Sequence, residues 1–489
     1  MLKRRYFFAF AVSLLALSGG VQAQTLSIDD CVGMALSENK TIRSAVYRAD
    51  QYKYTSKALK ANFFPNVSLQ LADFYSTLGG AVGVDIANPV GQYIVKRITE
   101  LAPLAASNGL GSWYLSTIPD RLEELNPNLS YSVNNVVSAM LQIEQPVYMG
   151  GKIRAGYKMG QLGAKMADLG IRVSEEEVIL KTYEAYSLVL KAQEMRAVAV
   201  KYDSLLVDVE RTVSSAVRNG MAAQADLMKV NAAKSKAQLQ VHQAENGLKI
   251  AKMNLCQVVG LPLNTGIDVL PIEDQLELAD VFSSPDVSER NEYHVLDMKT
   301  EIARENVKVE QANFLPQIGL MLAGGYINGG QLANQTMFNN KMHATVALNV
   351  KIPIFHAGEG RNKVQAAQAE YEQARLEQSN LTELMQLETQ KALNELDEAV
   401  LAEELNTRLV AQAEERLRVS RGAYNCGMET LADMLTAQTE WQNAYAEMVD
   451  AHYQRITKQI GWLKSAGKLG QRSTDSNKVT YVIHGESCN

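Results

Sequence analysis

The sequence predicts a mixed α and β membrane protein that arose by tandem duplication and combines β-hairpins with very long helical hairpins. Three observations lead to this fold class. One phrase is written twice, as "ANFFPNVSLQLADFY" at 61–75 and "ANFLPQIGLMLAGGY" at 312–326, with eight identical positions in fifteen. Two stretches, 147–261 and 354–489, contain none of the 11 prolines. The segments that precede each of these two stretches alternate apolar and polar residues, which is typical of β-strands.

The first 23 residues have the features of a secretory signal peptide. Three basic residues at 3–5 precede an apolar run, and small residues occupy the exit at 21–23. We therefore expect the mature protein to begin near Gln24, outside the cytoplasm, without a cysteine there for lipid attachment. No later apolar run approaches the roughly 20 residues of a membrane-spanning helix. Any part of the mature chain that enters a membrane is therefore expected to do so as β-strands.

Composition and charge restrict the class of protein further. The chain is 46% hydrophobic and 21% charged with a net charge of -6, which fits a folded protein and argues against a nucleic-acid partner. The four cysteines have no paired metal-ligand spacing, and sequence alone cannot rank their three disulfide pairings. They are Cys31, Cys256, Cys426 and Cys488.

A constant offset shows that the duplication is continuous. The segment "QPVYMGGKIR" at 145–154 aligns with "IPIFHAGEGR" at 352–361, and the same offset of 207 superposes "RNGMAAQADLMK" at 218–229 on "NCGMETLADMLT" at 425–436 without a gap. The twice-written phrase has an offset of 251. The first copy therefore carries 44 additional residues, which we place in a long inserted loop at 77–130. A repeat unit of about 200 residues is too long for a solenoid.

The two proline-free stretches are rich in Ala, Glu, Gln, Leu, Lys and Met, which favour helices. We expect each stretch to fold back once, at the matched Gly220 and Gly427, where a left-handed turn suits glycine. A helix from Lys152 to Asn219 would be about 100 Å long at roughly 1.5 Å per residue. Gly170 is the position at which such a helix could break.

Four segments with a period of two lie between the repeated prolines, two between Pro65 and Pro146 and two between Pro316 and Pro353. In "MHATVALNVKI" at 342–352, apolar residues alternate with mostly polar ones, and similar patterns begin near Val67, Ala139 and Ile318. Each predicts a strand of about ten residues with one apolar face, the pattern of a transmembrane β-strand. Aromatic residues flank both ends, as interfacial girdles would require. The alternative is a pair of soluble amphipathic hairpins that cover a core.

Four strands are too few to close a membrane barrel, because the smallest single-chain barrels have about eight. Open strand edges have no hydrogen-bond partners in lipid. We therefore expect several chains to share one barrel, and three chains with four strands each would form a twelve-stranded pore. The helices of the same three chains would continue as a long α-helical barrel.

The predicted organisation, in chain order, assigns a segment to each of these features. The segments are a signal peptide (1–23), first-repeat helices (24–64), a β-hairpin with the inserted loop (65–148), a long helical hairpin (149–260), a linker (261–288), a second-repeat helix (289–315), a second β-hairpin (316–355), a second long helical hairpin (356–467) and a C-terminal tail (468–489).

Several of these segments together resemble the TolC family of outer-membrane export tunnels. They are "TLSIDDCVGMALSENKTIRSAVYRA" at 25–49, the two "ANFxP" phrases, the proline-marked strand exits and "GAYNCGMETLADMLTAQTEWQNAYAEM" at 422–448. The resemblance implies an outer-membrane homotrimer that extends into the periplasm. Its implied partners are a periplasmic adaptor (membrane fusion) protein and an inner-membrane pump of the RND or ABC class, whose substrates it exports.

The resemblance also implies site residues at the periplasmic tip. Asp433 takes the place of the family's constriction acid and Tyr424 that of its gate tyrosine, which would hydrogen-bond to Asp226. The alternative for Asp433 is ordinary helix capping from Thr430. The turn residues become candidates for adaptor docking, although a tight turn explains the glycines equally well. These are Asn219, Gly220, Met221, Cys426, Gly427 and Met428.

No pattern in the sequence indicates catalysis. The six histidines never show metal-ligand spacing, and no nucleophile or phosphate-binding motif is complete. We expect no enzyme activity, metal or cofactor. A secreted coiled-coil stalk or adhesin without a pore is the main alternative, but it would need sustained heptads and no alternating strands.

Overall fold

The computed structural model describes residues 24–75, 79–82, 129–272, 286–332 and 335–469. The expected signal peptide, most of the inserted loop and most of the C-terminal tail lie outside the described residues. The chain divides into two compact units, and each takes segments from both repeats. The first comprises Met1–Ser56, Met159–Arg304 and Ala369–Asn489, and the second comprises Lys57–Lys158 and Glu305–Gln368.

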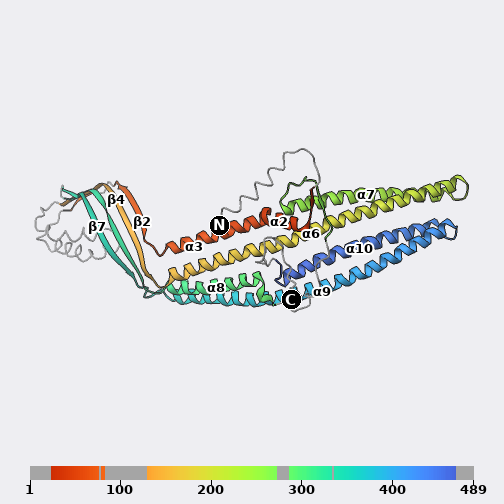
Figure 1. Ribbon diagram of the computed structural model, residues 1–489. Helices are drawn as coiled ribbons and strands as arrows, with labels where there is room; N and C mark the ends of the chain where they lie inside the picture. The colour runs from red at the N-terminus through yellow and green to blue at the C-terminus, as the bar shows by residue number, and fades with distance from the viewer. Residues whose placement is uncertain (1–23, 76–78, 83–128, 273–285, 333–334, 470–489) are drawn as a thin grey trace, which may run out of the picture. The chain divides into compact units, whose positions relative to one another are not determined.

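Four long helices form the two predicted hairpins (Figure 1). The first consists of α6 (Lys152–Arg218) and α7 (Gln224–Val259), and the second of α9 (Glu359–Asn425) and α10 (Leu431–Ser465). α6 does not break at Gly170, because one glycine costs only about 1 kcal/mol in a helix and a break would lose several hydrogen bonds. Among the described residues, no helix is long and apolar enough to span a membrane.

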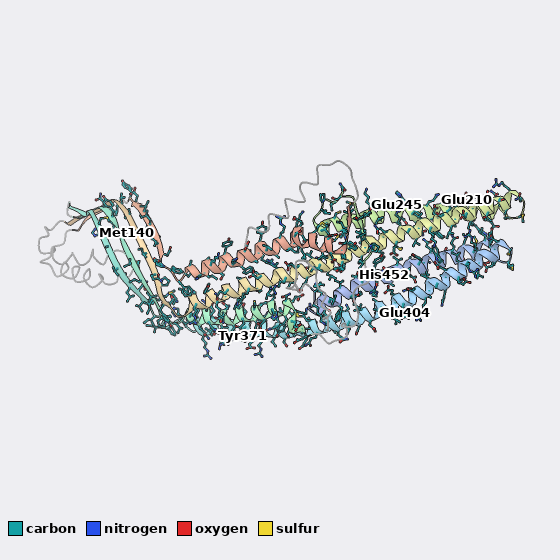
Figure 2. The ribbon with its side chains drawn as sticks, viewed as in Figure 1. Met140, Glu210, Glu245, Tyr371, Glu404 and His452 are labelled. Atoms are coloured by element: carbon teal, nitrogen blue, oxygen red, sulfur yellow. The ribbon has the colours of Figure 1, made fainter. Side chains whose placement is uncertain are left out.

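Ion pairs connect the two antiparallel helices of the first hairpin. Glu210 of α6 binds Lys234 of α7, and Arg196 of α6 lies 3.2 Å from Glu245 of α7. Figure 2 labels both glutamates, one on each helix. These side chains are partly exposed, so each pair contributes no more than about 1 kcal/mol. The hairpin is therefore held mainly by the apolar residues buried between its helices.

The largest apolar core of the first unit surrounds α2 (Ile28–Glu38), which packs against α6, α7 and α10. Next to it, β1 (Gln24–Leu26) pairs in parallel with β5 (Ile267–Val269), a contact that the sequence did not predict. The buried hydroxyl of Tyr186 lies 2.6 Å from the carbonyl oxygen of Leu270 and thereby ties α6 to this small sheet.

Three shorter helical segments complete the helical part. They are α3 (Lys40–Ala61), the 3-10 turn η3 (Val287–Glu289) and α8 (Asn291–Ala312). α3 and α8 each precede one copy of the repeated phrase, and they are the same length, 22 residues. This equivalence follows from the duplication.

One antiparallel sheet forms the β part of the second unit, in the order β2-β4-β6-β7, with β3 also paired to β4. Three strands are 16 to 21 residues long rather than about ten, and β3 falls in the segment expected to be a loop. Alternation is needed only where one face meets an apolar medium, and strands can continue to pair beyond that region. The strands are β2 (Asn66–Phe74), β3 (Gly79–Val82), β4 (Leu129–Met149), β6 (Gln317–Leu332) and β7 (Gln335–Lys351).

The two exits from strand to long helix have matching backbone conformations. Gly150 and Gly151 have φ of 62° and 89°, and their repeat counterparts Ala357 and Gly358 have φ of 48° and 85°. Two consecutive residues in the left-handed region turn the chain sharply from the sheet into α6 or α9. The duplication therefore extends to backbone geometry at these junctions.

Candidate functional site

The turns that close the two helical hairpins have the same hydrogen-bond pattern. In the first, the N–H of Gly220 donates to the carbonyl of Val217 (3.0 Å) and that of Met221 to Ala216 (2.8 Å). In the second, Gly427 donates to Tyr424 (3.0 Å) and Met428 to Ala423 (2.8 Å). Both are Schellman motifs, which require a residue with positive φ. Gly220 and Gly427 supply it, with φ of 73° and 71°.

Each of these turns exposes a methionine. Met221 is 82% exposed and Met428 is 75% exposed, and Asn219 and Cys426 are also exposed. Methionine is flexible and polarisable, and it is common on surfaces that bind other proteins. All six predicted docking residues therefore lie in two equivalent, accessible turns. Their role in docking stays a prediction.

A small apolar cluster lies behind the turns and joins the two hairpins. Its buried members are Val213 of α6, Val230 of α7, and Leu431 and Met434 of α10. The ring of Tyr424, near the end of α9, packs against this cluster. Tyr424 therefore packs against a cluster whose members come from both repeats, so a movement of one hairpin against the other would change the surroundings of its ring.

Asp226 and Tyr424 interact electrostatically in this region. Burial raises the pKa of Tyr424, and the negative charge of Asp226 raises it further. The Asp226 carboxylate lies 3.2 Å from the ammonium group of Lys229, one turn along α7. The structure shows no hydrogen bond between Tyr424 and Asp226 themselves. The two predicted gate residues are thus close enough to interact, and their gating role stays a prediction.

Asp433 is part of a capping box at the start of α10. Its carboxylate accepts hydrogen bonds from the backbone N–H of Thr430 (3.3 Å) and from its hydroxyl (2.6 Å). These hydrogen bonds lower the pKa of Asp433, so the exposed carboxylate carries a full negative charge at neutral pH. The capping role is thus present, and it is compatible with a role for the same charge in a pore.

Glu429 lies in the turn of the second hairpin, between Met428 and the N-cap residue Thr430. Its carboxylate accepts a hydrogen bond from the hydroxyl of Ser420, which is buried in α9. The contact holds the turn against the helix that precedes it. This turn therefore carries a carboxylate that is held by a hydrogen bond from the preceding helix.

In the sheet of the second unit, apolar residues of β2, β4, β6 and β7 stand opposite one another across the strands. Val67 of β2 pairs with Ile143, Ile143 with Leu322, and Leu322 with Val346 of β7. Paired residues point to the same face of a sheet. The neighbouring row on the opposite face is largely polar and consists of Ser68, Gln142, Ala323 and Thr345.

Many side chains of this apolar face are exposed within the single chain, among them Val67, Leu69, Leu71, Val346 and Leu348. Contiguous exposed apolar surface of this kind marks an interface with lipid or with another protein. The face is therefore expected to be covered in the functional protein.

Within the described part of the chain, Cys31, Cys256 and Cys426 are free thiols, and Cys488 lies outside it. Cys31 and Cys256 are buried in the core around α2, and burial raises the pKa of the Cys31 thiol to about 12. No group of three or more potential metal ligands occurs among the described residues. The described residues thus combine an amphipathic sheet with long helical hairpins that end in exposed turns.

Comparison with solved structures shows that this is the fold of outer-membrane channels. VceC from Vibrio cholerae matches with a TM-score of 0.70 at 13% identity, over 90% of this chain and 96% of that one. CmeC from Campylobacter jejuni matches with a TM-score of 0.72 at 16% identity, over 92% and 90%.

Sequence comparison agrees with the fold. The model of the family "Outer membrane efflux protein" matches residues 295–468. The proteases secretion protein PrtF of Dickeya chrysanthemi is 24% identical over 94% of this chain and 92% of its own length. The outer membrane protein TolC of Escherichia coli K12 is 22% identical over 76% of each chain.

Residues 295–468 thus match the outer membrane efflux protein family, and the chain as a whole is similar to proteins of the TolC type. It is an efflux or secretion channel of the outer membrane with a periplasmic extension. Members of this family are transport proteins rather than enzymes. The similarity to this family also implies a trimeric channel that acts within a tripartite system. The fold class, function and location predicted from the sequence are thus confirmed.

Sequence reasoning missed two features of these sites. It did not connect Tyr424 with the apolar cluster, because the members of that cluster are separated by up to about two hundred residues. It also missed a cleft beside Arg361 at the exit from β7. The repeat alignment held a signal for that cleft, since Val364 stands where the first copy has Tyr157.

Proposed function

We propose that three copies of this chain form one twelve-stranded β-barrel in the outer membrane, continued into the periplasm by a barrel of their long helices. The observation that carries the proposal is the amphipathic sheet with two open edges. β2 and β7 each pair with only one other described strand, and their outer edges need partners in lipid. Pairing β7 of one copy with β2 of the next satisfies both edges.

In this arrangement the apolar rows of the sheet face lipid and the polar rows line the pore. Glu144, Gln142, Gln70 and His343 belong to the polar face by register. A polar lumen bounded by apolar outer rows is the pattern of transmembrane barrels. The two soluble hairpins weighed as an alternative would need another element to cover the apolar face.

The periplasmic turns form the entrance of the channel. Asp433 from three copies gives a ring of negative charge that favours cations, and the electrostatic interaction between Tyr424 and Asp226 resists opening. The entrance opens when the second helical hairpin moves against the first. The inner-membrane pump and the adaptor supply the energy and the contacts for this movement.

The test of the pore is single-channel conductance of the purified oligomer in a planar bilayer. We expect a small, cation-selective conductance whose selectivity falls in Asp433→Asn. Asp30→Asn is the control, because Asp30 makes an equivalent capping box with Ser27 at the start of α2 (2.6 Å between side-chain oxygens). A verified oligomer that never conducts, even after deletion of the inserted loop, overturns the pore and favours the stalk.

The exposed turns provide the docking site for the periplasmic adaptor. An adaptor that ends in a helical hairpin can place apolar side chains against Met221 and Met428 of the adjoining turns. Replacement of both methionines by lysine is expected to abolish export and the cross-linking of a photoreactive residue at Asn219 to the adaptor. Replacement by leucine keeps the apolar contact and both activities. Full export by the lysine variant contradicts this site.

Two relatives favour protein as the cargo. PrtF is named for the secretion of proteases, and AprF of Pseudomonas aeruginosa, 21% identical over 70% of this chain, for the secretion of alkaline protease. We assign this chain to the export of a protein by an ABC-type pump rather than to drug efflux by an RND pump. Deletion of the gene should stop secretion of a protein and leave drug sensitivity unchanged. The opposite pattern assigns the channel to drug efflux.

A further inference from the structure

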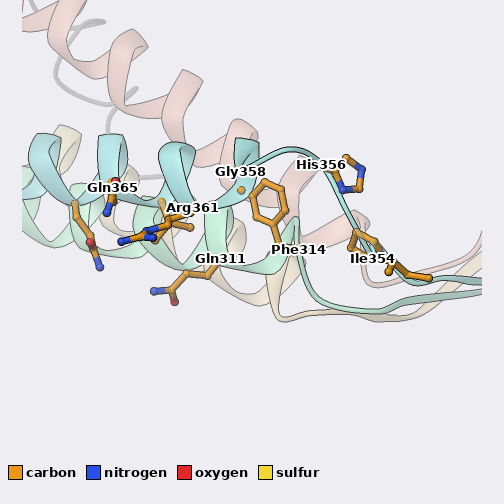
Figure 3. A pocket seen from close by; sticks show the side chains of 11 residues that line it. Gln311, Phe314, Ile354, His356, Gly358, Arg361 and Gln365 are labelled. Carbon is orange, nitrogen blue, oxygen red and sulfur yellow. The ribbon is translucent and has the colours of Figure 1, made fainter.

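A cleft of about 550 Å³ lies in the second unit where the chain passes from β7 into α9 (Figure 3). Its lining mixes apolar, polar and cationic side chains. Arg361, Gln365 and Gln368 come from one face of the first turns of α9, since they are spaced four and three residues apart. The other main contributors are Gln311, Phe314, Ile354 and His356.

The cleft lies at the end of the exposed apolar stripe of β7. Val346, Leu348 and Val350 alternate along the strand, and the same two-residue spacing continues to Ile352 and Ile354. Ile354 is 91% exposed and also lines the cleft. The stripe of apolar side chains therefore runs directly into a group of polar and cationic ones. This sequence of surfaces matches that of a phospholipid, whose acyl chains end at a polar headgroup.

Arg361 is available to bind an anion. It makes no ion pair among the described residues, whereas its neighbour Glu359 is already paired with Lys363 at 2.6 Å. The positive end of the α9 helix dipole lies at the same place and favours a negative charge there. A guanidinium group matches the geometry of phosphate oxygens and binds them through two hydrogen bonds.

A glycine keeps the cleft in its present form. A Cβ added at Gly360 would lie 2.5 Å from the ring of Phe314, so only glycine allows this ring to pack against the start of α9. The ring also contacts His356 edge-on, with centroids 6.5 Å apart. Phe314 thus forms a fixed apolar wall beside the polar groups.

The first repeat differs at the matching position. Arg154 corresponds to Arg361, but Tyr157 corresponds to Val364, and the Tyr157 ring packs edge-on against Phe63 at 5.9 Å. Phe63 is the counterpart of Phe314 in the repeated phrase. The second copy lacks the tyrosine ring, which leaves room beside Val364 for a ligand. The chain therefore contains its own control for the cleft.

We propose that this cleft binds the phosphodiester headgroup of a glycerophospholipid from the surrounding leaflet, with Arg361 as the anion ligand and the acyl chains along the apolar stripe of β7. One lipid per chain would fix the height of the sheet in the membrane. The proposal rests on the membrane-spanning sheet of the proposed function, and its test is chosen to fail independently of that function.

The experiment measures binding of phosphatidylethanolamine to the delipidated oligomer by native mass spectrometry. The wild type should bind about one tightly held lipid per chain. Arg361→Gln should weaken binding roughly tenfold, the effect of losing a charged hydrogen-bonding group. Val364→Tyr, which introduces the ring of the first repeat while keeping the charge, should weaken it to a similar extent. Arg154→Gln should bind like the wild type.

Each outcome separates this proposal from its alternatives. If Arg361→Gln and Arg154→Gln weaken lipid binding equally, any surface cation can hold the lipid. That result overturns the site. Displacement of the lipid by millimolar inorganic phosphate shows a site for free anions and also overturns it. All variants must migrate as oligomers in SDS and conduct in bilayers. A conducting channel without specific lipid binding refutes the cleft and leaves the pore intact.

Discussion

The carboxylate of Glu305 lies 2.6 Å from the ammonium group of Lys158, although only 3% of the Glu305 side chain is exposed. Lys308 binds the same carboxylate at 2.8 Å. Burial raises the pKa of Glu305, but the hydrogen bonds from the two lysines outweigh this and lower it overall. The contact joins α8 to the start of α6 and thus links the two repeats within the second unit.

Glu305→Ala is expected to lower the stability of the oligomer by about 2 kcal/mol, because it removes the carboxylate that both lysines bind, and the partly exposed lysines then return to water. Since the folded state lowers this pKa, the contribution is present above the unfolded pKa of about 4.3 and is lost as the pH falls below it. Thermal unfolding by circular dichroism measures the effect. Glu372→Ala, which breaks an exposed pair with Arg375 (3.5 Å), is the control.

The contribution of Glu176, in the first unit, to stability should have the opposite dependence on pH. Burial is the main reason that the pKa of Glu176 rises to about 7, and the charge of Glu292 adds to the rise. The amide of Asn291 donates a hydrogen bond to the carboxylate at 2.7 Å and lowers the pKa. The positive charges of Lys464 and Arg290 lower it as well. A folded pKa above the unfolded one stabilises the protein at low pH, and this stability is lost as the pH rises toward about 7.

Glu176→Gln should therefore remove part of the decrease in thermal stability between about pH 5 and pH 8, a change of roughly 1–3 kcal/mol. Glutamine keeps an acceptor for Asn291 but carries no charge. Unfolding curves of both proteins at several pH values test this. If the wild type and the variant lose stability in parallel, Glu176 does not titrate in this range.

Tyr424→Phe and Asp226→Ala should enlarge the resting conductance of the channel. Removing the tyrosine hydroxyl or the nearby charge weakens the contact between the hairpins while the apolar packing of the ring remains in Tyr424→Phe. Tyr371→Phe, on α9 in the first unit but 53 residues before Tyr424 in the sequence, removes a hydroxyl elsewhere and serves as the control. An unchanged closed state in both tip variants refutes the latch.

Leu69 and Gln70 are neighbours on β2 that point to opposite faces of the sheet. Leu69→Arg places a charge on the apolar face, where it should cost about 2–4 kcal/mol near the middle of a bilayer. Gln70→Arg places the same charge on the polar face and should be tolerated. SDS-resistant oligomer in the outer-membrane fraction is the measurement. Equal assembly of the two variants would show that Leu69 does not face lipid.

The sequence by itself determined the duplication, the long helical hairpins and the alternation of the strands. These are local properties: the composition of 147–261 sets helix preference, the spacing of Leu69 and Leu71 defines a face, and Gly220 and Gly427 mark turns that only glycine enters cheaply. Each can be recognised in a short window of residues. The resemblance to an export family then followed from their order and spacing.

Only the tertiary structure decided which distant residues meet. It sets the register that aligns Val67, Ile143, Leu322 and Val346 in one row, since a slip of one residue would reverse every face. It also pairs β1 with β5 and buries Glu176 beside Asn291. Such contacts depend on packing between segments far apart in the chain, which no local pattern encodes.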